Sequence, residues 1–92
     1  MPETAFTRTV LVANAAGLHA RAAAMIATLL RRFKARVTLA KGNNVVEGTE
    51  VLQILSLGAA AGESLTVEAT GEEARQALDA LEALFRDKFG EE

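Results

Sequence analysis

The chain has no cysteine, a single histidine and no surplus of basic residues. The lack of cysteine excludes disulfides, thiolate metal sites and thiol catalysis, and it is consistent with a reducing compartment. The formal net charge of −2 lacks the positive excess with which proteins bind the phosphate backbone of nucleic acids. No apolar run reaches membrane-spanning length, and residues 1–8 lack the apolar core of a signal peptide. We therefore expect a cytoplasmic protein that neither binds nucleic acid nor inserts into a membrane.

The length of 92 residues predicts one compact domain over residues 1–92 with one modest core. Half of the residues are apolar, but many of these are alanine. Leucine, isoleucine, valine and phenylalanine must therefore supply most of the buried surface.

Hydrophobic periodicity divides the chain into alternating strands and helices. Period-two alternation predicts strands, and apolar side chains spaced by three and four residues predict amphipathic helices. The expected strands cover residues 6–12, 35–41 and 64–70, with a short returning strand from Val45 after a turn at Gly42-Asn43. The expected helices cover residues 20–33, a short segment behind Thr49, and a last segment from residue 74 toward a stop at Gly90. This order predicts an α+β domain with one sheet, covered by helices on one face.

The same patterns predict local details. The first strand should bury Phe6, Val10 and Val12, whereas the open face of the sheet should carry Thr7, Thr9 and Thr38. Helix N-termini should be capped by Thr49 and by a capping box of Thr70 and Glu73. The last turn of the first helix should hold Arg31, Arg32 and Lys34, which would oppose the negative end of its dipole.

The single histidine, His19, stands where the first helix is expected to begin. The first N–H groups of a helix have no intrahelical partners, and together with the dipole they form an anion site. A neutral imidazole is nucleophilic, Arg21 can hold phosphate oxygens in a two-pronged geometry, and Gly17 permits a sharp turn before the histidine. Phosphoryl transfer needs little more than a positioned nucleophile and preorganised positive charge.

From these residues alone, the alternative that His19 only caps the helix stays open, with Arg21 a solvated first-turn residue. A zinc site has poorer support because one histidine and no cysteine could serve as ligands. A serine hydrolase has less, since no serine stands in a nucleophile-elbow sequence. No metal and no cofactor are expected.

The run Gly17-Leu18-His19-Ala20-Arg21 resembles the active-site signature of HPr, the histidine phosphocarrier of the bacterial phosphoenolpyruvate-dependent phosphotransferase system. The resemblance extends over almost the whole chain. Its tail is similar to the nitrogen-related paralogue of HPr and to proteobacterial HPr proteins, in the residues Val67-Glu68-Ala69-Thr70-Gly71, Ala83-Leu84-Phe85 and Phe89. It implies an open-faced β-sandwich, in which four antiparallel strands carry three helices on one face. It also implies a carrier rather than an enzyme, with His19 phosphorylated at Nδ1 and Arg21 steadying the phosphoryl group. The donor would be enzyme I and the acceptor an enzyme IIA.

The sequence departs from the family's pattern at three places. Ala22 stands where many members have proline, and Ala16 stands where asparagine often precedes the glycine. We expect the alanine in the first turn to have a small effect, because either residue is tolerated there. Glu50 occupies the place of a serine that is phosphorylated in some HPr proteins. Either Glu50 is simply a favourable acid at a helix N-terminus, or control by a kinase is missing or mimicked.

The resemblance also places a partner-docking patch beside the histidine, and we expect Leu52 to be exposed within it. The patch consists of Ala20, Ala24, Val51, Leu52 and Leu55, and the alternative that Val51 or Leu55 is an ordinary core residue stays open. A carrier must release its partners quickly, so the patch should be small and the protein a monomer. Two further functions compete with a sugar phosphocarrier. They are a regulatory nitrogen-related carrier that signals through its phosphorylation state, and a plain ligand-binding module in which His19 is only a cap.

Overall fold

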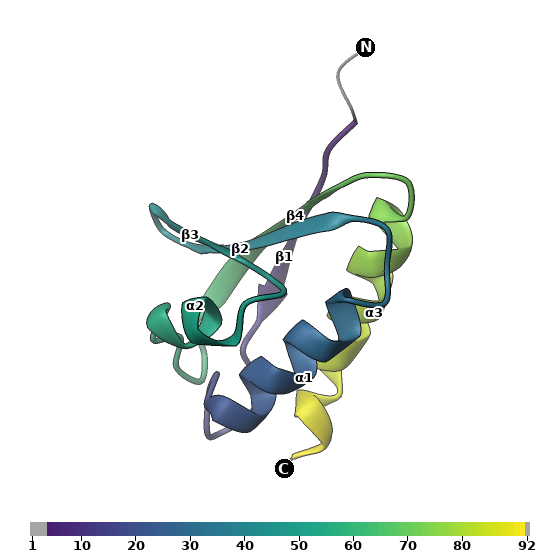
Figure 1. Cartoon of the computed structure of the whole chain (residues 1–92). Coiled ribbons are helices and arrows are strands. Elements are labelled where there is room, and N and C mark those ends of the chain that lie inside the picture. The colour runs from purple at the N-terminus through teal and green to yellow at the C-terminus, as the bar shows by residue number, and fades with distance from the viewer. Residues whose placement is uncertain (1–3, 92) are drawn as a thin grey trace.

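The computed structural model describes residues 4–91. The chain forms β1 (Phe6–Leu11), α1 (Ala20–Leu30), β2 (Arg36–Lys41), β3 (Asn44–Glu47), α2 (Val51–Ser56), β4 (Ser64–Thr70) and α3 (Ala74–Arg86). A 3-10 turn, η1 (Lys88–Gly90), follows α3. The expected order of strands and helices is confirmed (Figure 1).

The four strands form one antiparallel sheet in the order β1-β4-β2-β3. The three helices lie together on one side of this sheet (Figure 1). α3 packs on β1 and β4, and α1 packs against both α2 and α3. The predicted α+β fold, an open-faced β-sandwich, is therefore confirmed.

The core lies between the sheet and the helices, and alternation along the strands supplies the residues on its sheet side. β4 shows this most clearly, because Leu65, Val67 and Ala69 are buried while the residues between them are exposed. The helices contribute Ile26, Leu30, Ile54, Leu78, Leu81 and Phe85. On the open face Thr7 and Thr9 are exposed and Thr38 is half-buried, as the alternation predicts.

The first strand differs from its prediction at both ends. It ends at Leu11 rather than Val12, although Val12 is buried. Phe6 is 37% exposed, so its predicted burial is wrong. The reason is its place at the beginning of an edge strand, where only β4 flanks it. Arg8, on the same side as Phe6, pairs instead with Asp79 and Glu82 of α3, at 2.6 and 2.5 Å.

The first helix is shorter than predicted. It ends at Leu30, and residues 31–33 continue as turns in which the N–H of Arg32 bonds the carbonyl of Leu29. The predicted basic last turn is therefore wrong, since Arg31, Arg32 and Lys34 follow the helix. Arg31 instead donates a 2.6 Å hydrogen bond to the carbonyl of Thr49, which ties the end of α1 to the entrance of α2.

Both predicted N-caps are wrong. Glu50 rather than Thr49 is the N-cap of α2, and its side chain makes no capping hydrogen bond. Thr70 is the last residue of β4, paired with Arg36, so it cannot begin a capping box. Glu73 is the N-cap of α3, and its carboxylate accepts the backbone N–H of Lys34 at 2.8 Å. α3 ends at Arg86, ahead of the expected stop at Gly90.

No helix of the described residues, 4–91, is long and apolar enough to cross a membrane.

Candidate functional site

His19 is the N-cap of α1, which begins at Ala20 as predicted. Its backbone is extended, its carbonyl accepts the N–H of Ala23 at 2.9 Å, and its ring Nδ1 accepts the N–H of Arg21 at 3.3 Å. The residue is therefore a helix cap, as predicted by the interpretation in which His19 caps the first helix. Its side chain nevertheless stays 35% exposed, so a group on another molecule can reach the ring.

The loop before His19 is held by close backbone contacts. Gly17 has a φ of +69°, and a Cβ at this position would lie 2.8 Å from the carbonyl oxygen of Ala59. The next residue, Leu18, is buried, and its N–H bonds that same carbonyl at 3.0 Å. Only glycine fits where the loop passes so close to the Ala59 backbone. This close approach fixes the direction in which the chain enters His19.

Asn14 connects this loop to the C-terminal end of the chain. Its side chain is fully buried, and Nδ2 donates to the carbonyl of Gly17 at 2.8 Å and to Oε1 of Glu91 at 3.1 Å. A buried amide is normally retained for such hydrogen bonds. The sequence indicated Asn14 only as a turn residue.

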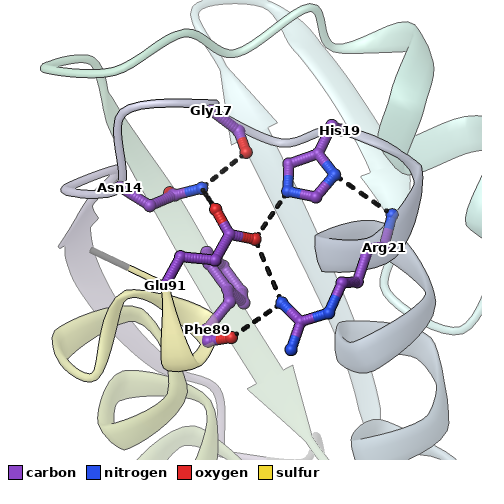
Figure 2. A network of polar contacts seen from close by, with 6 residues as sticks. All are labelled: Asn14, Gly17, His19, Arg21, Phe89 and Glu91. Carbon is purple, nitrogen blue, oxygen red and sulfur yellow. Dashed lines mark hydrogen bonds and ion pairs between the residues drawn. The ribbon is translucent and has the colours of Figure 1, made fainter.

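Glu91 lies at the centre of the polar network in Figure 2. Its Oε2 lies 2.6 Å from Nε2 of His19 and 3.1 Å from Nη1 of Arg21. The hydrogen bonds from Asn14 and His19, together with the positive charge of Arg21, lower the pKa of the Glu91 carboxyl, so the group is an anion at neutral pH.

Arg21 also anchors the C-terminal turn. Its Nη1 donates to the carbonyl of Phe89 at 3.0 Å, and the Phe89 ring is buried edge-on against Phe85. Lys88 and Phe89 have φ values of +55° and +56°. This left-handed turn brings the chain back from the end of α3 to the entrance of α1, where Glu91 meets the imidazole (Figure 2).

The arrangement combines a nucleophile with positive potential. Nδ1 points toward the N-terminus of α1, where backbone N–H groups lack intrahelical partners, and the guanidinium of Arg21 lies on the Nε2 side of the ring, across the Glu91 carboxylate (Figure 2). Such a site can accept an anionic group onto the imidazole. Among residues 4–91, no three potential metal-ligating carboxylates or histidines gather into a cluster.

His19 and Arg21 are thus brought together as the sequence predicts, whereas Asn14 and Glu91 were missed. Burial of a polar residue in a turn is the signal that could have indicated Asn14. No sequence signal indicates Glu91, because it is 72 positions from His19.

The predicted docking patch lies on the two helices beside His19. Leu52 is 82% exposed, which confirms that expectation, and Ala20 and Ala24 are exposed on α1. Val51 and Leu55 are half-buried and pack against the core. They therefore offer only part of their surface to a partner.

A shallow groove between α1 and α3, which shares Ala24 with the docking patch, was not predicted. α1 supplies most of its lining, chiefly Ala24, Met25 and Leu29, and Leu84 of α3 supplies the opposite wall. Arg21 and Arg32 also line this apolar groove, so it borders the candidate site.

Comparison with known proteins identifies relatives over nearly the full length. A family model described as "PTS HPr component phosphorylation site" matches residues 6–87. Phosphocarrier protein NPr of Shewanella violacea is 39% identical over 96% of this chain and 97% of that protein. Phosphocarrier protein HPr of Cupriavidus necator is 33% identical over 91% of this chain and 94% of its own length. A crystal structure of HPr-C-His from Thermoanaerobacter tengcongensis superposes with a TM-score of 0.91 at 33% identity, covering 95% of this chain and 98% of that one.

Proposed function

Because this chain belongs to the HPr family of phosphocarrier proteins of the phosphotransferase system, we propose that His19 is the residue that carries the phosphoryl group and that Arg21 steadies it. The observation that carries this proposal is the placement of Nδ1 at the N-terminus of α1, where the backbone N–H of Arg21 reaches it at 3.3 Å. The family carries phosphoryl groups between proteins, so no turnover of a small-molecule substrate is assigned to this chain.

In the proposed transfer, the lone pair of Nδ1 attacks the phosphorus of a phosphohistidine on enzyme I. A new N–P bond forms, the donor's N–P bond breaks, and its electron pair returns to the donor nitrogen. The phosphoryl oxygens then face the N–H groups at the start of α1 and the Arg21 side chain. Delivery to a histidine of an enzyme IIA reverses these steps.

Docking would use Ala20, Ala24 and Leu52, with the exposed parts of Val51 and Leu55. α1 and α2 pack against each other, so their exposed apolar side chains can form one surface beside His19. A patch of this small size favours brief encounters over a stable complex. We treat the protein as a cytoplasmic monomer, with residues 1–92 as one HPr-like unit.

The sugar branch of the phosphotransferase system is one candidate, and the regulatory nitrogen-related branch is the other. Relatives named NPr favour the second, since one shares 39% of its residues with this chain over almost its whole length. Both branches use the same phosphohistidine chemistry. Comparing phosphorylation rates with enzyme I from each branch, and then acceptance by each type of IIA, would assign this chain.

The direct test mixes the protein with phosphoenolpyruvate, Mg²⁺ and enzyme I. We expect a phosphoryl adduct that is labile in acid and stable in base, and its absence from His19→Ala. Arg21→Ala should slow transfer because a charge-assisted contact is lost. Arg75→Ala is the matched control, since it removes an exposed arginine from α3. An adduct that survives His19→Ala would overturn the proposal.

A further inference from the structure

Three donors from separate parts of the chain converge on the Glu91 carboxylate. Asn14 contacts one oxygen from the loop, whereas His19 and Arg21 contact the other from the start of α1 (Figure 2). An ionised carboxylate can only accept hydrogen bonds. At 2.6 Å from Oε2, Nε2 of His19 must therefore be the nitrogen that carries a proton.

The contact at the other ring nitrogen, Nδ1, independently assigns the same tautomer. The N–H of Arg21 reaches Nδ1 at 3.3 Å, and a backbone N–H can only donate. Nδ1 of the neutral ring is therefore unprotonated, and its lone pair faces the helix N-terminus. Tautomers follow from the hydrogen-bond network in this way, and here two contacts agree.

We propose that Glu91 is a positioning residue: by holding the His19 proton on Nε2, it keeps Nδ1 as the nucleophilic nitrogen and orients the ring toward the phosphoryl site. This inference deepens the proposed function and rests on His19 being the phosphoryl carrier. When the N–P bond forms at Nδ1, the proton stays on Nε2 and the ring becomes cationic. The Glu91 carboxylate, 2.6 Å away, then balances that charge until delivery returns the electron pair to Nδ1.

The C-terminal turn holds Glu91 in place for this role. Phe89 is fully buried, its ring packs on Phe85, and its carbonyl accepts Nη1 of Arg21. The left-handed backbone at Lys88 and Phe89 is unfavourable for residues with side chains, so packing must hold it. A carboxylate on a freely moving tail could not fix the ring, whereas one held by this anchored turn and by Asn14 can.

The contact itself is tested by NMR on the full chain with ¹⁵N-labelled histidine. We expect a downfield Nε2–H signal with slow solvent exchange and a Nδ1 shift typical of an unprotonated nitrogen. Glu91→Ala should remove the downfield signal. Asp87→Ala is the matched control, because it removes an exposed carboxylate from the same end of the chain, and it should leave the signal unchanged. Protonation of Nδ1 in the neutral wild-type ring would overturn the inference.

The consequence is tested by the rate of phosphoryl uptake from purified phosphorylated enzyme I. Carboxylates that fix the tautomer and orientation of a metal-bound histidine change affinity or activity by roughly 10–100-fold when they are mutated, and by analogy we expect Glu91→Ala to be slower by about tenfold. Glu91→Gln keeps an acceptor oxygen and should restore part of the rate, whereas Asp87→Ala should match the wild type.

An unchanged rate in Glu91→Ala would overturn the inference. A faster rate would overturn it too, since it would mean that the carboxylate competes with the phosphoryl group for Arg21. If the wild type takes up no phosphoryl group, the proposed function fails. The NMR experiment still decides whether Glu91 sets the tautomer, so the two failures are distinguishable.

Discussion

Replacing Gly17 by alanine tests whether the loop before His19 must cross the α2–β4 connection so closely. Gly17 has a φ of +69°, and an added Cβ would lie 2.8 Å from the Ala59 carbonyl oxygen and 3.2 Å from the Ala60 Cα. Both neighbours are backbone atoms, so no flexible side chain can move aside. Gly42→Ala is the matched control, because Gly42 has a φ of +60° and a Cβ there would meet nothing within 4 Å.

The two substitutions share the cost of a left-handed alanine, roughly 1–2 kcal/mol. They also share the lost flexibility of the unfolded chain, so the difference between them isolates the close contact. Overpacking of a tight site costs roughly 1–3 kcal/mol. Weakening the hydrogen bond from Leu18 to the Ala59 carbonyl costs about 1 kcal/mol more. We therefore expect Gly17→Ala to be less stable than Gly42→Ala by roughly 2–4 kcal/mol.

Urea denaturation of both variants, followed by circular dichroism, measures this difference. The folded fraction of Gly17→Ala should also take up phosphoryl groups at least tenfold more slowly, because about 1 Å of misplacement can cost a hundredfold. Stabilities of the two variants within about 0.5 kcal/mol of each other, near the usual limit for neutral surface changes, would refute the reasoning. The loop would then have shifted without cost, and Gly17 would not fix the entry of His19.

Three further predictions concern docking, the Glu50 position and pH. Leu52→Asp should slow transfer from enzyme I. Its urea midpoint should stay unchanged, because the Leu52 side chain is 82% exposed. Leu11→Asp is the control, at a residue that is 53% exposed on β1, and it should leave transfer unchanged. Incubation with an HPr kinase and ATP should give no phosphate; phosphate on Thr49 or Ser56 would contradict the view that this control is absent. The Arg36 guanidinium lowers the pKa of the Glu47 carboxyl in the folded state. The pair therefore stabilises the fold at pH values above the carboxyl's pKa in the unfolded chain. This stabilisation is lost as the pH falls through the lower pKa of the folded state. The melting temperature of the wild type should fall in that acidic range, and the melting temperature of Glu47→Gln should fall less steeply.

The fold could be predicted from the sequence because each element has a simple period. β4 shows perfect alternation, and its predicted bounds of 64–70 match the structure. α1 and α3 bury the apolar residues that are spaced by three and four positions. The Gly42-Asn43 turn also connects β2 and β3 as expected, since Lys41 pairs with Asn44 across it.

The errors occur where tertiary contacts override local preference. Thr70 and Glu73 have the spacing of a capping box, but sheet pairing extends β4 through Thr70, and the Glu73 carboxylate accepts the N–H of Lys34 instead. Similarly, α1 stops at Leu30 although Phe33 continues its stripe, and Arg31 just beyond contacts Thr49 near the start of α2. Local propensity cannot foresee a competing partner that is distant in sequence.

The site shows the same division between local and distant information. His19 and Arg21 are two positions apart, so one helix entrance suffices to bring them together and the sequence could indicate them. The proposed tautomer of His19, in contrast, depends on Glu91, which is held beside the ring by the buried Phe89 and the left-handed C-terminal turn. A motif can therefore identify the imidazole, but which of its nitrogens is free to react is decided by packing at the other end of the chain. Truncation or substitution of this C-terminal segment should consequently alter the chemistry of His19 even though the motif around it stays intact.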